Sequence, residues 1–170
     1  MKGRIRILFV FAIIGIFFLI FSGGVIWDTL QNEVLKKGIV SLSFDQQYVS
    51  KVGKFTVYYP KSGSIDNISD TSVTVTHVID ESEQKISCAL QGTYEPEKQL
   101  FLSDFELPEY NAKRVTIQGR QWVYSQNPDP QWITVEDGTT YVLKSKNSEY
   151  SILFCQKVLD NLEIYSKNSE

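Results

Sequence analysis

The chain has 170 residues, of which 42% are hydrophobic, and a formal net charge of −3. This length suits one domain with its own hydrophobic core. Three of the 17 basic residues fall within the first six positions, so the remaining chain, with 20 acidic residues, is acidic and lacks the clustered cations of a nucleic-acid-binding protein.

An apolar segment, residues 7–27, follows these N-terminal cations, and its first fifteen residues carry no polar side chain. As a helix it would be about 31 Å long, which matches the hydrocarbon core of a bilayer. The preceding cations predict that the N-terminus is cytoplasmic and that the rest of the chain lies outside the cytoplasm. The alternative is a signal peptide cleaved near Gly24, which would release the same domain as a secreted protein.

A short polar stretch separates this segment from the rest. Asp28 can cap a helix over Thr29–Lys37, and Gly38 is expected to end it, giving a stalk. The predicted organisation is a cytoplasmic tip and transmembrane anchor, a stalk or linker, an extracytoplasmic domain and a tail, at residues 1–27, 28–38, 39–166 and 167–170.

The first part of the domain has strand-like patterns. Val40–Phe44 alternates apolar and polar residues, and Lys54–Pro60 is aromatic and β-branched. Lys61–Asp70 is polar and is predicted to be a loop. Ser72–Ile79 is a predicted strand with one apolar-rich face, formed by Val73, Val75, His77 and Ile79.

Less regular structure follows. After a predicted turn at Asp80–Gln84, Lys85–Gly92 is a further predicted strand. Tyr94–Asn111 is the least regular segment, and a short helix is expected between Pro96 and Pro108.

Two hairpins come next in the chain. Arg114–Ser125 is predicted to turn at Gln118-Gly119, and Gln131–Ser145 is predicted to turn at Asp137-Gly138. The second signal is strong because both turn positions tolerate a positive φ.

The pattern then changes to helical spacing, with Asn147 or Ser148 as the cap and a short strand, Leu162–Tyr165, after the helix. The apolar stripe consists of Ile152, Leu153, Phe154, Cys155, Val158, Leu159 and Leu162. The chain is therefore predicted to be α+β, with an N-terminal transmembrane helix followed by an antiparallel sheet and a C-terminal helix packed on it.

Two stretches resemble a known family. "GKFTVYYPKSG" (Gly53–Gly63) is similar to the opening strand of PsbP-like domains, and "FCQKVLDNLEI" (Phe154–Ile164) to the closing helix of short single-anchor bacterial envelope proteins with this fold. The chain departs from the pattern at Gly63, where an aromatic residue is expected soon after the proline. The resemblance implies an α-β-α sandwich in a non-enzymatic accessory or binding protein, and it transfers no catalytic residue.

Candidate catalytic and metal-binding residues are few. His77 is the only histidine and lies in a predicted strand, with Cys88 eleven positions further along the chain. One histidine and two distant cysteines do not have the spacing of a zinc site. The acidic clusters in Ile79–Glu83 and Ser103–Glu109 lack EF-hand spacing and are interpreted as solvated turns. We therefore expect no metal, no cofactor and no enzymatic activity.

The two cysteines, Cys88 and Cys155, allow two interpretations. In an exported domain they are a natural disulfide pair, because a helix lying on a sheet would bring them together. Alternatively, both are buried thiols that act as small apolar side chains.

An aromatic set on the two hairpins is the candidate binding surface, and packing in the core is its other interpretation. It consists of Trp122, Tyr124, Trp132 and Tyr141. We expect a membrane-tethered extracytoplasmic domain that binds an envelope partner protein. The alternative is a carrier-type module that takes an apolar ligand between the sheet and the helix.

Overall fold

The computed structural model describes residue 29 and residues 31–66, 68–79 and 84–165. The chain divides into two compact units, Met1–Gly38 and Ile39–Glu170. The predicted anchor at residues 7–27 and most of the predicted turn at Asp80–Gln84 lie outside the described residues. Within the described ranges, no helix combines the length and the apolar character needed to cross a membrane.

The start of the domain differs from the prediction. Helical structure covers residues 31–40, so the helix continues past Gly38, and residues 42–45 have no regular structure. The predicted strand at Val40–Phe44 is therefore wrong. Ile39 is buried within the helix, and this burial outweighs both the weak helix propensity of Gly38 and a short alternating pattern.

A small antiparallel sheet has the order β1-β2-β10. Its strands are β1 (Gln46–Ser50), β2 (Phe55–Tyr59) and β10 (Leu162–Ile164). The predictions for β2 and β10 are confirmed, whereas β1 was not predicted. The central strand β2 carries Phe55 and Val57, both fully buried.

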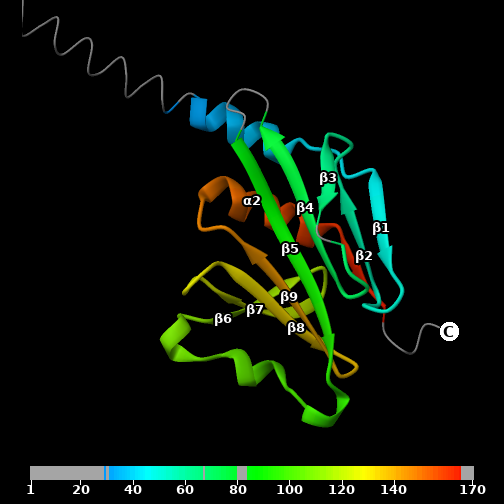
Figure 1. Cartoon of the computed structure of the whole chain (residues 1–170). Coiled ribbons are helices and arrows are strands. Elements are labelled where there is room, and N and C mark those ends of the chain that lie inside the picture. The colour runs from blue at the N-terminus through cyan, green and yellow to red at the C-terminus, as the bar shows by residue number, and fades with distance from the viewer. Residues whose placement is uncertain (1–28, 30, 67, 80–83, 166–170) are drawn as a thin grey trace, which may run out of the picture. The chain divides into compact units, whose positions relative to one another are not determined.

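The large sheet has seven strands in the order β3-β4-β5-β9-β8-β7-β6, and all its neighbours are antiparallel (Figure 1). The strands are β3 (Gly63–Asp66), β4 (Ser72–Ile79), β5 (Gln84–Tyr94), β6 (Lys113–Ile117), β7 (Arg120–Ser125), β8 (Gln131–Glu136) and β9 (Thr139–Ser145). The prediction that Lys61–Asp70 is entirely loop is wrong, because β3 lies within it. As an edge strand with polar residues, β3 has little apolar alternation to reveal it.

Both predicted hairpin turns are present. Gln118 and Gly119 have φ values of 51° and 76°, and Asp137 and Gly138 have values of 48° and 74°. Two consecutive positive φ values are the geometry that twists a two-residue hairpin correctly. The hairpins therefore form as predicted, β6 with β7 and β8 with β9.

The two hairpins are joined by a short ladder. The β7–β8 ladder has three residue pairs, whereas the β6–β7 and β8–β9 ladders have five and six. Beyond the pair Val123 and Ile133, the Thr134 hydroxyl donates to the Gln121 carbonyl at 2.8 Å. A side chain thus continues the contact between β7 and β8 where the backbone ladder stops.

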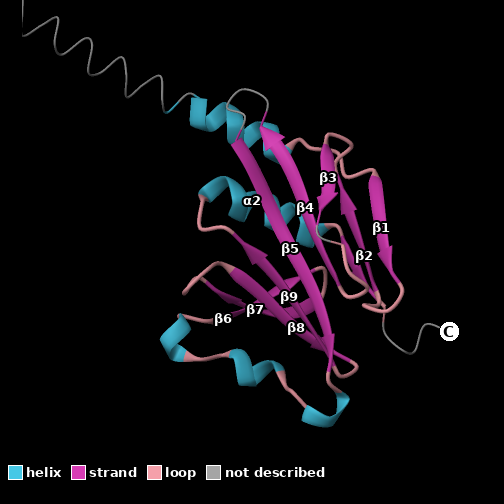
Figure 2. Ribbon diagram, in the orientation of Figure 1, coloured by secondary structure: helices cyan, strands magenta, loops and turns pink. Residues whose placement is uncertain are grey.

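The predicted C-terminal helix is α2 (Glu149–Asp160), which packs against β5 and β9 of the large sheet and β2 of the small one (Figures 1 and 2). Ser148 caps it, because its hydroxyl oxygen accepts from the Ser151 amide at 3.2 Å. The side chains of Phe154, Cys155 and Val158 are fully buried. The architecture is therefore α+β with a helix on the sheet.

Three 3₁₀ turns lie between β5 and β6: η1 (Pro96–Lys98), η2 (Leu102–Phe105) and η3 (Pro108–Tyr110). The short helix expected between Pro96 and Pro108 corresponds to η2. This turn contacts β7 and β8. Val123 and Ile133, which point away from α2 on these strands, are 0% and 7% exposed. The turn η2 thus covers the face of β7 and β8 that is turned away from α2.

Candidate functional site

The predicted aromatic set lies on the face of the large sheet that is turned toward α2. Strand register places Tyr124 opposite Trp132, and Tyr141 opposite both Thr134 and Gly92. Trp122, Trp132 and Tyr141 are only 1–2% exposed, while Tyr124 is half-buried. Most of this set is therefore core, and Tyr124 is the member with accessible surface.

A groove of about 550 Å³ lies between this sheet face and α2. Tyr124 and Trp132 line it, with ring centroids 5.0 Å apart. The rest of its lining comes from β6, from the residue after β7 and from one side of α2: Lys113, Val115, Ile117, Gln126, Ile152, Gln156 and Asp160. The three α2 residues are spaced by four and so share one side of the helix. We call this the α2–β6 groove.

The α2–β6 groove carries opposite charges at its two ends. Lys113 begins β6, and its ammonium nitrogen lies 5.5 Å from the centre of the Tyr124 ring. Asp160 ends α2, and its backbone carbonyl accepts from the side-chain amide of Gln118, directly after β6. Among the described residues, neither the Lys113 nor the Asp160 side chain forms an ion pair. The groove therefore has a cationic end, an apolar middle and an anionic end.

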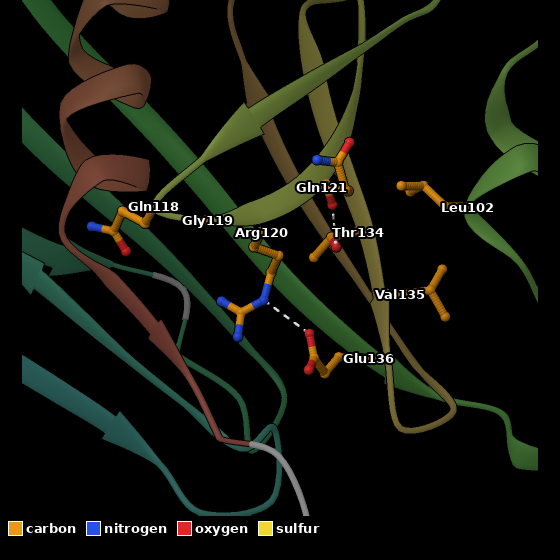
Figure 3. A pocket seen from close by; sticks show the side chains of 8 residues that line it. All are labelled: Leu102, Gln118, Gly119, Arg120, Gln121, Thr134, Val135 and Glu136. Carbon is orange, nitrogen blue, oxygen red and sulfur yellow. Dashed lines mark hydrogen bonds and ion pairs between the residues drawn. The ribbon is translucent and has the colours of Figure 1, made fainter.

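A second pocket of about 440 Å³ lies beside the β6–β7 turn (Figure 3). Arg120 points toward Glu136 in it, with the guanidinium Nε and a carboxylate oxygen 2.9 Å apart. Arg120 also donates to the Ile164 carbonyl at 3.4 Å. Its charged groups are thus engaged within the chain, which makes it a weaker candidate than the α2–β6 groove.

The pKa values of Tyr141 and Asp66 are shifted from their ordinary values by identifiable surroundings. Burial raises the pKa of the Tyr141 hydroxyl above its ordinary value of 10.0. The pKa of Asp66 is lowered by a hydrogen bond from the Thr76 side chain and then by Lys85, whose ammonium lies 3.2 Å from the carboxylate. Neither group lines the α2–β6 groove, so these shifts bear on stability.

The sole histidine, His77, contacts a side chain of α2 and a serine hydroxyl. The His77 ring stacks on Phe154 at 6.0 Å, and its Nδ1 lies 3.4 Å from the Ser62 hydroxyl. Cys88 is joined to Cys155 by a disulfide, so it offers no thiol to His77. Among the described residues, the contacts of the His77 ring include no carboxylate that would orient it toward the Ser62 hydroxyl, as a third group does in a catalytic triad.

The acidic clusters also have partners within the chain where they are described. The Asp104 carboxylate accepts from the Phe101 amide at 2.7 Å, and Glu106 pairs with Arg114. Residues 80–83 lie outside the described residues. In the described part of the chain, no group of three or more His, Cys, Asp or Glu could hold a metal ion.

Several groove residues were not singled out by the sequence. Val115 and Ile117 are alternate residues of an edge strand, and Ile152 lies at the margin of the helical apolar stripe. Ile152 was expected to pack in the core, whereas it is half-buried beside the groove. The alternation of apolar and polar residues in β6 can be read from the sequence, but the position of α2 beside this strand cannot.

No family model and no curated protein matches the chain. A crystal structure from Bacteroides thetaiotaomicron VPI-5482 is similar, with a TM-score of 0.57 and 15% identity, and the match covers 75% of this chain and 51% of that one. The chain thus spans about half the length of that protein, and the likeness is one of fold alone.

A second similar structure is the solution structure of cyanobacterial PsbP (CyanoP) from Synechocystis sp. PCC 6803. Its TM-score is 0.47 and its identity 11%, and the match covers 71% of this chain and 92% of that one. PsbP is also the family that two stretches of this sequence resemble.

Proposed function

We propose that this protein is a membrane-tethered extracytoplasmic binding domain, and that its α2–β6 groove receives part of an envelope partner protein. The groove carries the proposal, because it presents two uncompensated charges on either side of an apolar lining. Such a mixture is typical of recognition sites, where apolar contacts supply affinity and charges fix orientation. The apolar segment at residues 7–27 and the cations before it support the tether and its orientation.

The chemistry of the lining supports recognition over catalysis. Lys113 and Asp160 lie at opposite ends of the groove, and the polar groups between them are the amides of Gln126 and Gln156. General acid–base and nucleophilic catalysis both need reactive groups within hydrogen-bond reach of each other. The described lining brings no such pair together, and it is suited to holding a ligand without changing it.

A small apolar ligand is the second candidate for the same groove. A volume of about 550 Å³ falls within the range of small-molecule sites. Tyr124, Trp132 and Ile152 would supply its apolar contacts. A bound small molecule would leave the two end charges exposed to water, which is why we place a polypeptide first.

Site-specific photo-cross-linking in native membranes tests the proposal. A photoreactive amino acid at Gln156, an exposed groove residue, should give a discrete protein adduct. The matched control is Lys144, which is exposed on β9 and points to the opposite face of the sheet. The Ile152→Asp substitution should reduce the adduct at Gln156. Equal labelling from both positions would contradict a partner in the groove.

The carrier alternative makes a different prediction. The full chain extracted in a mild detergent would then retain a small molecule, visible as added mass in native mass spectrometry. The Ile152→Asp substitution should remove that added mass, because a carboxylate at this position opposes apolar binding. An adduct at Gln156 without any retained small molecule would favour the partner protein.

A further inference from the structure

Among the strands that the structure describes, β6 pairs on one side only and has a free edge on the other. The order β3-β4-β5-β9-β8-β7-β6 leaves β6 at the end of the large sheet, with β7 as its neighbour on one side (Figure 1). An edge strand exposes backbone donors and acceptors that can pair with another extended chain. The edge of β6 lies directly beside the α2–β6 groove, because Val115 and Ile117 of the same strand line it.

The hairpin register shows which backbone groups face outward. A two-residue turn makes Ile117 and Arg120 the closing hydrogen-bonded pair, and hydrogen-bonded pairs alternate along an antiparallel ladder. The amide and carbonyl groups of Arg114 and Thr116 therefore point away from β7. A hydrogen bond on β7 supports this assignment. The Gln121 carbonyl accepts from the Thr134 hydroxyl on β8, so it faces away from β6. Thr116, which lies opposite Gln121, is therefore in a pair without hydrogen bonds between β6 and β7.

The side chains of the outward-facing residues leave this edge clear. Arg114 pairs with Glu106, and the Thr116 hydroxyl accepts from the Gln121 side chain at 2.7 Å. By the alternation of the strand, both side chains lie on the face opposite the groove. The groove side of β6 consists of Lys113, Val115 and Ile117, a length of about 14 Å.

We propose that the partner binds by adding an extended strand to the free edge of β6, so that its alternate side chains enter the α2–β6 groove. This inference rests on the proposed function and specifies the partner's chemistry. Backbone hydrogen bonds to Arg114 and Thr116 hold the segment, and pockets for alternate side chains select it. Every second residue of the partner's strand faces the groove. We expect these residues to be an acidic residue beside Lys113, two apolar residues in the middle and a basic residue near Asp160.

The charge pattern favours a separate partner over a second copy of this chain. If two β6 strands paired antiparallel about Val115, Lys113 of each would lie opposite Ile117 of the other. Lys113 of the second copy would then lie toward Asp160, but its β6, Lys113–Ile117, has no acidic residue to place beside Lys113. A heterologous segment with the pattern above neutralises both.

The test uses two fluorescent peptides, Glu-Thr-Val-Thr-Val-Thr-Lys and Lys-Thr-Val-Thr-Val-Thr-Glu, one for each strand direction. The full chain in nanodiscs should bind one of them, and hydrogen–deuterium exchange should slow over residues 113–117. A peptide with the same composition but adjacent valines should bind more weakly, because one valine then faces away from the groove. Lys113→Glu should weaken the preferred peptide. If neither peptide slows exchange in β6, the proposal is wrong.

Backbone dependence is tested by Thr116→Pro against Thr116→Ala. Both lose the hydroxyl that contacts Gln121, but only proline removes the outward amide, which β7 does not use. Thr116→Pro should bind the peptide about tenfold more weakly than Thr116→Ala. Equal affinity of two folded variants would overturn strand addition. If the Gln156 cross-link persists in Thr116→Pro, the groove still binds a partner and only strand addition fails.

Should Thr116→Pro not fold, the exchange pattern of the unmodified chain decides the matter. Protection of residues 113–117 by the alternating peptide, and its absence with the adjacent-valine peptide, supports strand addition. Protection confined to α2 contradicts it, because such a ligand occupies the groove without pairing with β6.

Discussion

Cys88 on β5 and Cys155 on α2 are joined by a disulfide, and their Cα atoms lie 5.2 Å apart. Both residues are almost completely buried, at 1% and 0% exposure. The bond connects a strand in the middle of the large sheet with the helix that forms one wall of the α2–β6 groove. It closes a loop between residues 67 positions apart.

Removing this bond should destabilise the domain without unfolding it. In the chain-entropy account, a loop of this size corresponds to about 4 kcal/mol of stability. The double variant Cys88→Ala, Cys155→Ala should show this loss in urea unfolding followed by circular dichroism. The unmodified chain measured with and without reductant is the control. Unchanged unfolding in both comparisons would show that the bond contributes nothing to stability.

Trp122 and Tyr124 are two residues apart on β7 and point to the same face, but they differ in burial. Trp122→Ala should cost about 3–5 kcal/mol, because its side chain is 2% exposed and its loss leaves a cavity. Tyr124→Ala should cost clearly less stability but weaken groove binding. Thermal unfolding beside peptide binding separates the two roles. Similar losses of stability for both variants would contradict this division.

The two hairpin glycines form a matched pair. Gly119 and Gly138 have similar positive φ values of 76° and 74°, so alanine is strained at both by about 1 kcal/mol or more. An added Cβ at Gly119 meets nothing within 4 Å, whereas at Gly138 it lies 3.3 Å from the Cα of Pro96. Gly138→Ala should therefore lower the melting temperature more than Gly119→Ala. The reverse order would show that the contact with Pro96 relaxes freely.

The lowered pKa of Asp66 gives a pH-dependent prediction. The folded state favours its carboxylate, so this group adds stability above its ordinary pKa of 3.8, and that stability is lost as pH falls through the lower folded-state pKa. Asp66→Asn should lower the melting temperature slightly at pH 7. The difference from the unmodified chain should shrink below a pH of about 3.8. If the difference in melting temperature between Asp66→Asn and the unmodified chain stays constant as the pH falls, the carboxylate charge does not cause the stabilisation.

Local signals in the sequence predicted a large part of the fold. Asp137-Gly138 and Gln118-Gly119 predicted the positions of both hairpin turns, because few residue pairs adopt positive φ values at two consecutive positions. Helical spacing and the Ser148 cap predicted α2 almost to its ends. For Cys88 and Cys155, the sequence identified the pair but left the bond undecided, since pairing depends on where the helix lies on the sheet.

Features set by distant contacts could not be predicted. Strand β3 is defined by its pairing with β4, and β1 by its pairing with β2, while their own side chains are mostly polar. The α2–β6 groove could not be predicted either, because it also depends on contacts between segments that are distant in the sequence. Lys113 and Asp160 are far apart in the chain, and only the packing of α2 against β5 and β9 makes them the two ends of one groove.

The short β7–β8 ladder means that the two walls of the groove are attached to the sheet in different ways. The disulfide holds α2 firmly to the sheet, whereas the β6–β7 hairpin is attached to β8 through three residue pairs and side-chain contacts such as Thr134 with Gln121. Side-chain contacts of this kind break singly and at low cost compared with a continuous ladder. One wall of the groove is therefore attached to the sheet by a covalent bond, and the other by a short ladder and single side-chain contacts.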